Sequence, residues 1–260
     1  MCLSIGRLKN ILLDNSLFFL IQNPSFKKII FFIPIVAIFL IVISKLVFGV
    51  DNDIYQEITI EDGPIEYATA IVYFVSSIFS FLICKYFIQR KNFFILFLIL
   101  GVGFLVVGFE EISWGQRIFD FSPPNWFPSN TQGETTIHNL TSLIKYRHAS
   151  FMVVAFIGAF TWLILPKIYH KFFKIPGKNY QMFLRYAVPS KYLITYFLPI
   201  FILWLIWDLT PRAYRSVLGI RWNFFVWYDS EPLELLLSIG ILLFVLNSYF
   251  KLRVDSKNLF

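Results

Sequence analysis

Six runs of about 20 mostly apolar residues constrain the fold of this sequence more than any other feature. As an α-helix, a run of this length is long enough to cross the hydrocarbon core of a membrane. A helix also satisfies its own backbone hydrogen bonds inside a bilayer. The sequence therefore predicts an all-α, polytopic membrane bundle that forms one integral membrane domain over residues 1–260. We expect its transmembrane spans at residues 29–50, 64–88, 92–111, 149–169, 191–210 and 231–251.

The N-terminal segment is expected to lie on the membrane rather than cross it. Residues 8–23 are apolar but too few to span the hydrocarbon core. We interpret them as an amphipathic helix in the membrane interface. The segment contains Asp14 and lacks a small-residue cleavage site, so it does not resemble a cleavable signal peptide.

The charged residues predict the orientation of the bundle. Sixteen of the 23 Lys and Arg residues lie in the N-terminal segment, in the loops after the second and fourth spans, and in the C-terminal tail, whereas 14 of the 16 Asp and Glu residues lie on the other side. By the positive-inside rule, both termini are cytoplasmic. The formal net charge of +7 thus reflects topology and does not indicate nucleic-acid binding, because the basic residues lie between spans. Cys2 and Cys84 provide neither a disulfide framework nor a thiolate metal cluster.

Glu66 and Glu234 are candidate catalytic residues at the outer ends of the second and sixth spans. They close two similar strings, E-D-G-P-I-E and D-S-E-P-L-E. The proline in each string suits the first turn of a helix, where a carboxylate interacts favourably with the helix dipole. That purely structural role is one interpretation. The other is that both carboxylates turn inward and meet the acids that end the third span, because acids at membrane depth are by default functional.

Glu110 and Glu111 end the third span and are further candidate catalytic residues. Neighbouring helical residues point about 100° apart, so only one of the two can face the centre of a bundle squarely. We expect one of them to act as a general base. Arg117 follows Glu110 by seven residues and shares its face if the helix continues. It would then either neutralise Glu110 or hold an anionic group of a substrate.

Glu134 and His138 form the candidate metal site. Their separation of four residues places both on one face of a helix, where a carboxylate and an imidazole can reach one cation. One histidine among several carboxylates suits Mn²⁺, Fe²⁺ or Mg²⁺ better than a structural zinc ion. The predicted cofactor is one divalent metal ion of unassigned identity.

Outer-face residues with amide or guanidinium groups are the candidate substrate-binding residues. Guanidinium groups suit bidentate recognition of phosphate, but they also pair with nearby acids or lipid headgroups. Both interpretations stay open for the arginines. The candidates are Gln116, Arg117, Asn139, Arg212 and Arg215.

Two strings, G-F-E-E-I-S-W-G-Q-R-I-F and N-T-Q-G-E-T-T-I-H-N-L, with E-D-G-x-x-E ahead of them, carry a resemblance to a known family. They resemble an uncharacterised family of bacterial multi-pass membrane proteins over residues 61–140. The resemblance implies a shared polytopic fold and a place in the bacterial cytoplasmic membrane. It implies no activity.

The gathering of polar residues at one membrane face favours an enzyme. Our leading hypothesis is a membrane-embedded hydrolase or group transferase that acts on a lipid or lipid-linked substrate. The first alternative is a proton- or cation-coupled transporter, although the middle of the spans is poor in ionisable groups. The second alternative is a membrane assembly or interaction protein whose outer loops bind a partner.

Overall fold

The structure, a computed structural model, describes residues 23–49, 53–60, 63–88, 94–125, 127, 133–137, 140, 142–143, 146–172, 178–209 and 229–257. Its long helices are α2 (Pro24–Phe48), α4 (Pro64–Ile88), α5 (Phe94–Glu111), α7 (Arg147–Phe172), α9 (Ile194–Leu209) and α11 (Ser230–Lys257). Its short helices are α3 (Asp53–Thr59), η1 (Ser113–Gly115), α6 (Gln116–Phe119), α8 (Lys178–Ala187) and η3 (Lys191–Leu193).

Apart from Gly49, the described residues of all six expected spans are helical, which confirms the predicted all-α bundle. Within the described residues, five ranges are long and apolar enough to cross a membrane. The sixth helix, α5, has 18 residues and no charged side chain before Glu110, and it is at the short end of the spanning range. α7 and α11 continue past the expected ends to Phe172 and Lys257. The interfacial helix expected over residues 8–23 lies outside the described residues.

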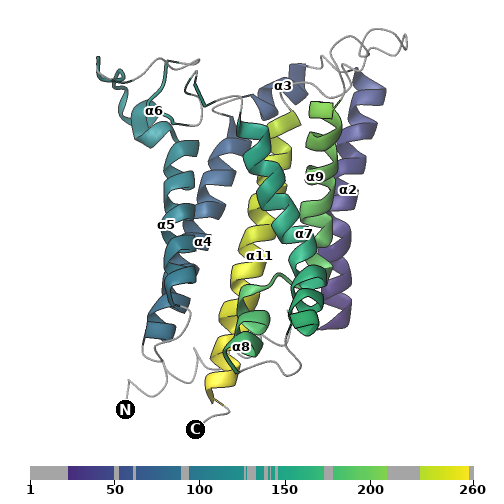
Figure 1. Cartoon of the computed structure of the whole chain (residues 1–260). Helices are drawn as coiled ribbons and strands as arrows, with labels where there is room; N and C mark the ends of the chain where they lie inside the picture. Colours follow the sequence, from purple (N-terminus) through teal and green to yellow (C-terminus); the bar gives the residue numbers. More distant parts are fainter. Residues whose placement is uncertain are drawn as a thin grey trace, which may run out of the picture.

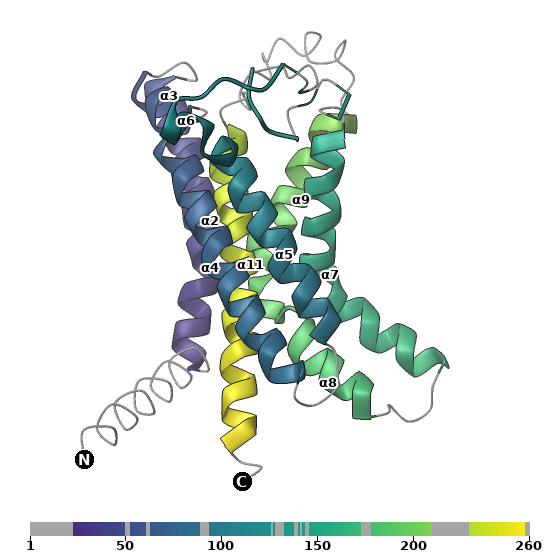
Figure 2. The same cartoon turned by 90° about the vertical axis from the view of Figure 1, so that its left-hand side faces the viewer.

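α11 is the central helix of the bundle. Within its candidate span 67% of the residues are buried, compared with 17% for α2 and for α7. α4 packs extensively on α5 and α11 on one side, while α7 packs on α9 and α9 contacts α2 and α11 on the other (Figures 1 and 2). The first turn of α2 and the last turn of α11 lie at the same end of the bundle (Figure 1). That this end is cytoplasmic stays a prediction.

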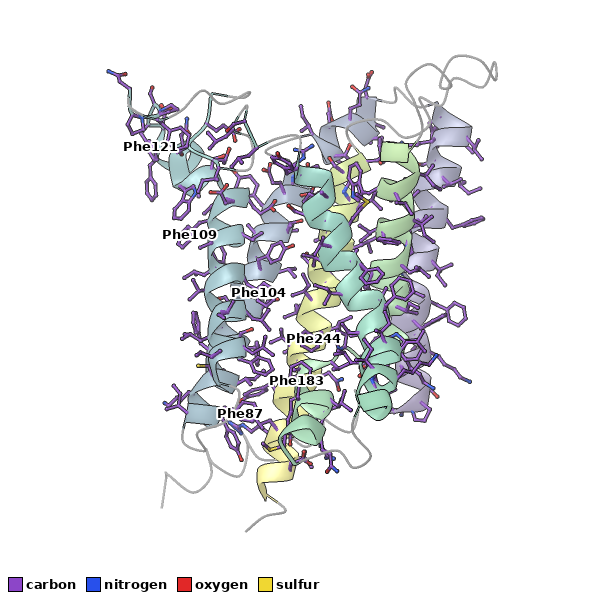
Figure 3. All side chains as sticks on the ribbon, in the orientation of Figure 1. Phe87, Phe104, Phe109, Phe121, Phe183 and Phe244 are labelled. Atoms are coloured by element: carbon purple, nitrogen blue, oxygen red, sulfur yellow. The ribbon has the colours of Figure 1, made fainter. Side chains whose placement is uncertain are left out.

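Apolar side chains cover the outward faces of the long helices (Figure 3). Phe39 on α2, Ile71 on α4 and Ile99 on α5 are each about 60% exposed (60%, 62% and 64%). A soluble protein rarely leaves so much contiguous apolar surface in water. These faces therefore suit contact with lipid chains, as expected for a multi-pass membrane protein.

A buried ion pair fastens α2 to the start of α11. The Lys45 ammonium group donates to the Asp229 carboxylate, and the Tyr55 hydroxyl of α3 donates to the other oxygen of the same carboxylate. The Lys45 ammonium nitrogen also lies 5.2 Å from the centre of the Tyr55 ring. The arrangement holds α2 and α3 against the first turn of α11, where two further glutamates follow.

Candidate functional site

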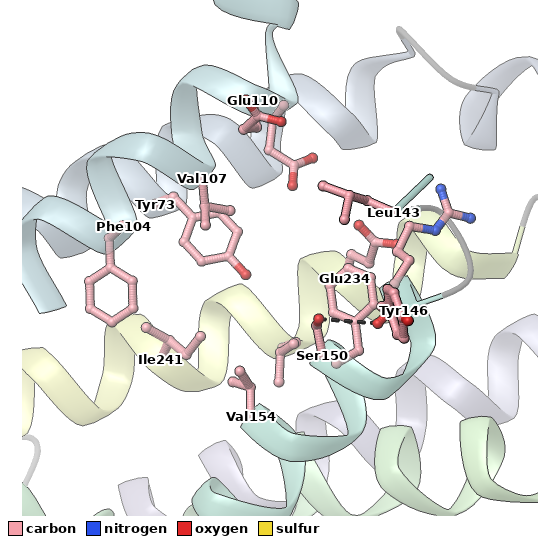
Figure 4. Close-up of a pocket in the computed structure, with 14 residues that line it drawn as sticks. Tyr73, Phe104, Val107, Glu110, Leu143, Tyr146, Ser150, Val154, Glu234 and Ile241 are labelled. Atoms are coloured by element: carbon pink, nitrogen blue, oxygen red, sulfur yellow. Dashed lines mark hydrogen bonds between the residues drawn. The ribbon is translucent and has the colours of Figure 1, made fainter. Parts of the chain in front are cut away.

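A cleft of about 400 Å³ separates α5 from α7, with α4 and α11 behind it (Figure 4). Its volume lies within the usual range for small-molecule sites. The inner part is apolar and is lined by Phe104, Val107, Val154, Leu237 and Ile241. The outer end carries the polar residues Glu110, Glu111, Arg147 and Glu234. The cleft therefore has an apolar chamber inside the bundle and an ionisable mouth.

Three carboxylates meet at this mouth. One ligand oxygen from each of Glu111, Glu231 and Glu234 lies within 4.8 Å of the other two. Glu231 and Glu234 are buried, and Glu111 is partly buried. Three ionised carboxylates at this separation repel one another unless a cation or a proton lies among them. This chemistry suits either binding of a hard divalent cation or proton transfer by a carboxyl group.

Two further charged groups act on the acidic cluster from outside it. The charges of Glu66 on α4 and Arg147 on α7 both act on Glu111 and Glu234. Arg147 opposes the mutual repulsion of the acids, and Glu66 adds to it. The acids at one end of α4, α5 and α11 are thus brought together. Glu66 lies in the first turn of α4, so its capping role and its place beside the cluster are compatible.

Glu110 lines the cleft, but its carboxylate holds the sharp turn that follows α5. We call this turn, over residues 112–116, the corner. One oxygen accepts a hydrogen bond from the Trp114 indole at 2.5 Å, and the other accepts one from the backbone N–H of Ile137 at 2.6 Å. The Trp114 ring also stacks on Phe109, with centroids 5.4 Å apart. Glu110 therefore anchors the corner, whereas Glu111 faces the acidic cluster.

The chain turns sharply at this corner, so α5 does not continue toward Arg117. Ser113 and Trp114 have φ values of 49° and 55°, and Gly115 has a φ of 80°. The left-handed region is uncommon for non-glycine residues, and such strain occurs where surrounding contacts impose it. The condition for Arg117 to share a helical face with Glu110, a continuous helix, is therefore not met. The Arg117 side chain lies outside the described part of the chain.

Residues 133–137 pack on this corner through side-chain hydrogen bonds. The Glu134 carboxylate accepts from the hydroxyls of Ser113 at 3.1 Å and Thr136 at 3.2 Å. The Gln116 side-chain carbonyl accepts from the Thr135 backbone N–H at 2.8 Å. The two strings that carry the family resemblance thus bind each other. Gln116, expected as a substrate ligand, joins these two strings.

The helical geometry assumed for the candidate metal pair is absent. Residues 133–137 form bends rather than a helix, because their backbone is held by the corner instead of by helical hydrogen bonds. Glu134 is not a member of the carboxylate cluster found among the described residues. Glu134 therefore does not lie on a helix, and its pairing with His138 stays a prediction. His138, Asn139, Arg212 and Arg215 lie outside the described residues.

Sequence reasoning missed three residues of the site. Glu231 precedes Glu234 by three residues, a spacing that places both on one helical face. Tyr73 follows Glu66 by seven residues on α4 and is buried beside the cleft, where the charges of Glu111 and Glu234 act on its hydroxyl. These two spacings were visible in the sequence. No sequence signal connects Arg147 with the acids, because they meet only through the packing of α7 opposite α5.

Comparison of the chain with protein-family models, with curated proteins and with solved structures finds no match.

Proposed function

We propose that this protein is a membrane-embedded enzyme that acts on a lipid or lipid-linked substrate in the cleft between α5 and α7. The observation that carries the proposal is the division of the cleft into an apolar chamber and a carboxylate-lined mouth. An amphiphile has the same division. Its hydrocarbon chain would lie beside Phe104, Val154 and Ile241, and its polar group would meet Glu111 and Glu234.

Within this proposal Glu111 and Glu234 are the residues that touch the polar group of the substrate. Both line the cleft, and both belong to the cluster of three acids. A buried carboxyl group among other acids retains a proton readily, so it can act as a general acid and, once ionised, as a general base. Arg147 lines the same mouth and would bind an anionic group such as a phosphate. Glu110 and Glu134 serve to position the corner above them.

The cluster also fits a divalent metal ion. Glu111, Glu231 and Glu234 each offer a carboxylate oxygen, the type of ligand that Mg²⁺ and Mn²⁺ prefer, and these oxygens are mutually close. When bound, such an ion would polarise an ester or phosphoryl oxygen of the substrate. Beside the ion, Arg147 would orient the anionic group of the substrate. The apolar chamber would exclude water from the hydrocarbon chain of the substrate.

The test combines metal content with lipid turnover. The purified protein is analysed for bound metal and then incubated in proteoliposomes with a bacterial lipid extract, whose species are followed by mass spectrometry. We expect a stoichiometric divalent metal and a time-dependent change in one lipid class. Glu111→Gln and Glu234→Gln should lose both. Glu57→Gln is the matched control, because Glu57 is an exposed acid on α3 outside the cluster.

An unchanged lipid profile with Mg²⁺, Mn²⁺, Fe²⁺ and Zn²⁺ supplied in turn would refute the enzyme proposal. Lipid turnover in metal-free protein that still depends on Glu111 would show that the reaction needs the carboxylates but no metal ion. Proton or cation flux into the same vesicles, lost in Glu234→Gln, would instead support the transporter. The closeness of three carboxylates is the observation that favours transport, whereas the apolar chamber beneath the acids opposes an ion path.

A further inference from the structure

A second cavity lies at the opposite end of the bundle from the acidic cluster. It has a volume of about 470 Å³ and is formed where α2 begins, α8 and η3 meet, and α11 approaches its end. α8 lies beside the last turns of α11 at this end (Figure 1). Four basic side chains from four different helices line the cavity: Lys27, Arg185, Lys191 and Lys251.

Basic side chains outnumber acidic ones among the described residues at this pocket. None of the described residues that line it is acidic. Asp255 stands next to it and forms a salt bridge of 2.5 Å with Arg185. Among the described groups, Arg185 and Lys27 repel the Lys251 charge and Asp255 attracts it. An anion in the pocket would relieve this repulsion.

Contacts with uncharged groups hold two of the cations at the pocket. The Lys251 ammonium group donates to the backbone carbonyl of Arg185 at 3.4 Å. The Lys27 ammonium nitrogen lies 5.8 Å from the centre of the Tyr192 ring. A carbonyl and an aromatic ring orient a lysine without neutralising it. These contacts place the two lysines beside Arg185 and Lys191, which also line the pocket.

The remaining residues of the pocket provide further polar groups and an apolar side, which suit the headgroup and the hydrocarbon chain of a phospholipid. The Asn247 amide donates to the Ser190 hydroxyl at 2.8 Å, and this pair adds polar groups to the wall. Trp162 and Pro166 of α7 form an apolar side of the pocket, and the neighbouring Leu163 and Ile168 of that helix are exposed. Phosphate recognition by basic groups beside an apolar wall is typical of pockets between spans that bind anionic lipid headgroups.

We propose that this basic pocket binds the phosphate group of an anionic membrane lipid. The lipid chain would lie along α7, and the headgroup would join α2, α8 and α11. Cytoplasmic leaflets of membranes are negatively charged, and the charge distribution of the sequence predicts that this end of the bundle is cytoplasmic. A lipid bound only to the folded bundle would stabilise it by mass action.

Lipid binding to the purified protein in neutral detergent tests this proposal. Native mass spectrometry with phosphatidylglycerol and with phosphatidylcholine gives the affinity for each, and the melting temperature gives the stabilisation. We expect preferential binding of phosphatidylglycerol. Lys251→Gln should weaken this binding about fivefold, and the double variant Lys27→Gln with Lys251→Gln about 25-fold. Each lysine contributes roughly a factor of five near an anionic surface. Lys251→Arg should retain binding within about twofold, because it keeps the charge.

Lys28→Gln is the matched control, because Lys28 is an exposed lysine on the same turn of α2 as Lys27 and does not line the pocket. An equal loss in Lys28→Gln, or equal binding of both lipids, would overturn the proposal in favour of general surface attraction. A third arm replaces the lipid with inorganic phosphate at matched ionic strength. Stabilisation by phosphate equal to that by phosphatidylglycerol, removed by Lys251→Gln, would overturn the lipid assignment and indicate a site for a free anion.

Discussion

The ion pair between Lys45 and Asp229 provides the sharpest stability prediction. Their side chains are only 1% and 6% exposed, so both charges are removed from water. Lys45→Met would leave the Asp229 carboxylate buried without its cation, with Tyr55 still donating to it. Removing one partner of a buried pair typically costs about 3–5 kcal/mol, because the remaining charge is uncompensated. We expect the free energy of unfolding to fall by about that amount.

The companion change is the double variant Lys45→Met with Asp229→Asn. A neutral amide retains an acceptor for Tyr55 and removes the buried charge. Replacing both partners of a buried pair is often close to neutral, so the double variant should be more stable than Lys45→Met alone by about 2 kcal/mol or more. This non-additivity is the coupling energy of a double-mutant cycle.

Reversible unfolding in mixed micelles of a mild detergent and SDS, followed by circular dichroism, measures these differences. Lys28→Met is the control, because it removes an exposed lysine from the same helix and should change stability by less than about 0.5 kcal/mol. A free energy of unfolding for Lys45→Met equal to that for Lys28→Met would refute the stabilising role of the buried ion pair. It is also refuted if the double variant is as unstable as Lys45→Met, since the pair would then not be coupled.

Three further changes test the packing, the corner and the cleft. Gly158→Ala would place a Cβ 2.4 Å from the Phe197 ring. In the same assay it should lower the free energy of unfolding by about 1–3 kcal/mol. The control Gly103→Ala should be tolerated, because its Cβ would have nothing within 4 Å. Glu134→Ala should lose about 1–3 kcal/mol even in metal-free protein, since two buried hydroxyls lose their acceptor; unchanged stability there would contradict its anchoring role. Val154→Trp should fill the apolar chamber and abolish lipid turnover while leaving metal content unchanged, and normal turnover would place the substrate elsewhere.

The helices were predictable from the sequence, whereas the contacts at the end of α5 were not. α4 begins and ends at the expected residues, because Pro64 starts a helix and the apolar run determines its length. Beyond Glu111 the sequence continues with I-S-W-G-Q-R, which has no helix-breaking proline. The turn has positive φ angles at Ser113 and Trp114, and Ser113 is held by hydrogen bonds with Glu134 and Thr135 from a distant part of the sequence. The helix α5 therefore does not continue to Arg117, contrary to what the sequence pattern alone would suggest.

The roles of the individual acids likewise depended on tertiary contacts. The sequence could not decide between Glu110 and Glu111, because both end the same helix and point about 100° apart. Packing of α5 against α4 turns Glu111 toward α11, and the loop at residues 133–137 occupies Glu110. Glu231 was overlooked because it adjoins a proline in a string that was interpreted as a helix start.

By itself, the sequence determined a helical membrane bundle, the positions of its spans and the end at which its acids gather. Those properties follow from hydrocarbon thickness and from backbone hydrogen bonding, which act along one chain segment at a time. Only the tertiary structure decided which acids share a cleft, which of them anchor a loop, and where four basic side chains enclose a second pocket. Such groupings depend on the rotation and neighbours of each helix, and these are determined by side-chain packing between segments far apart in the chain.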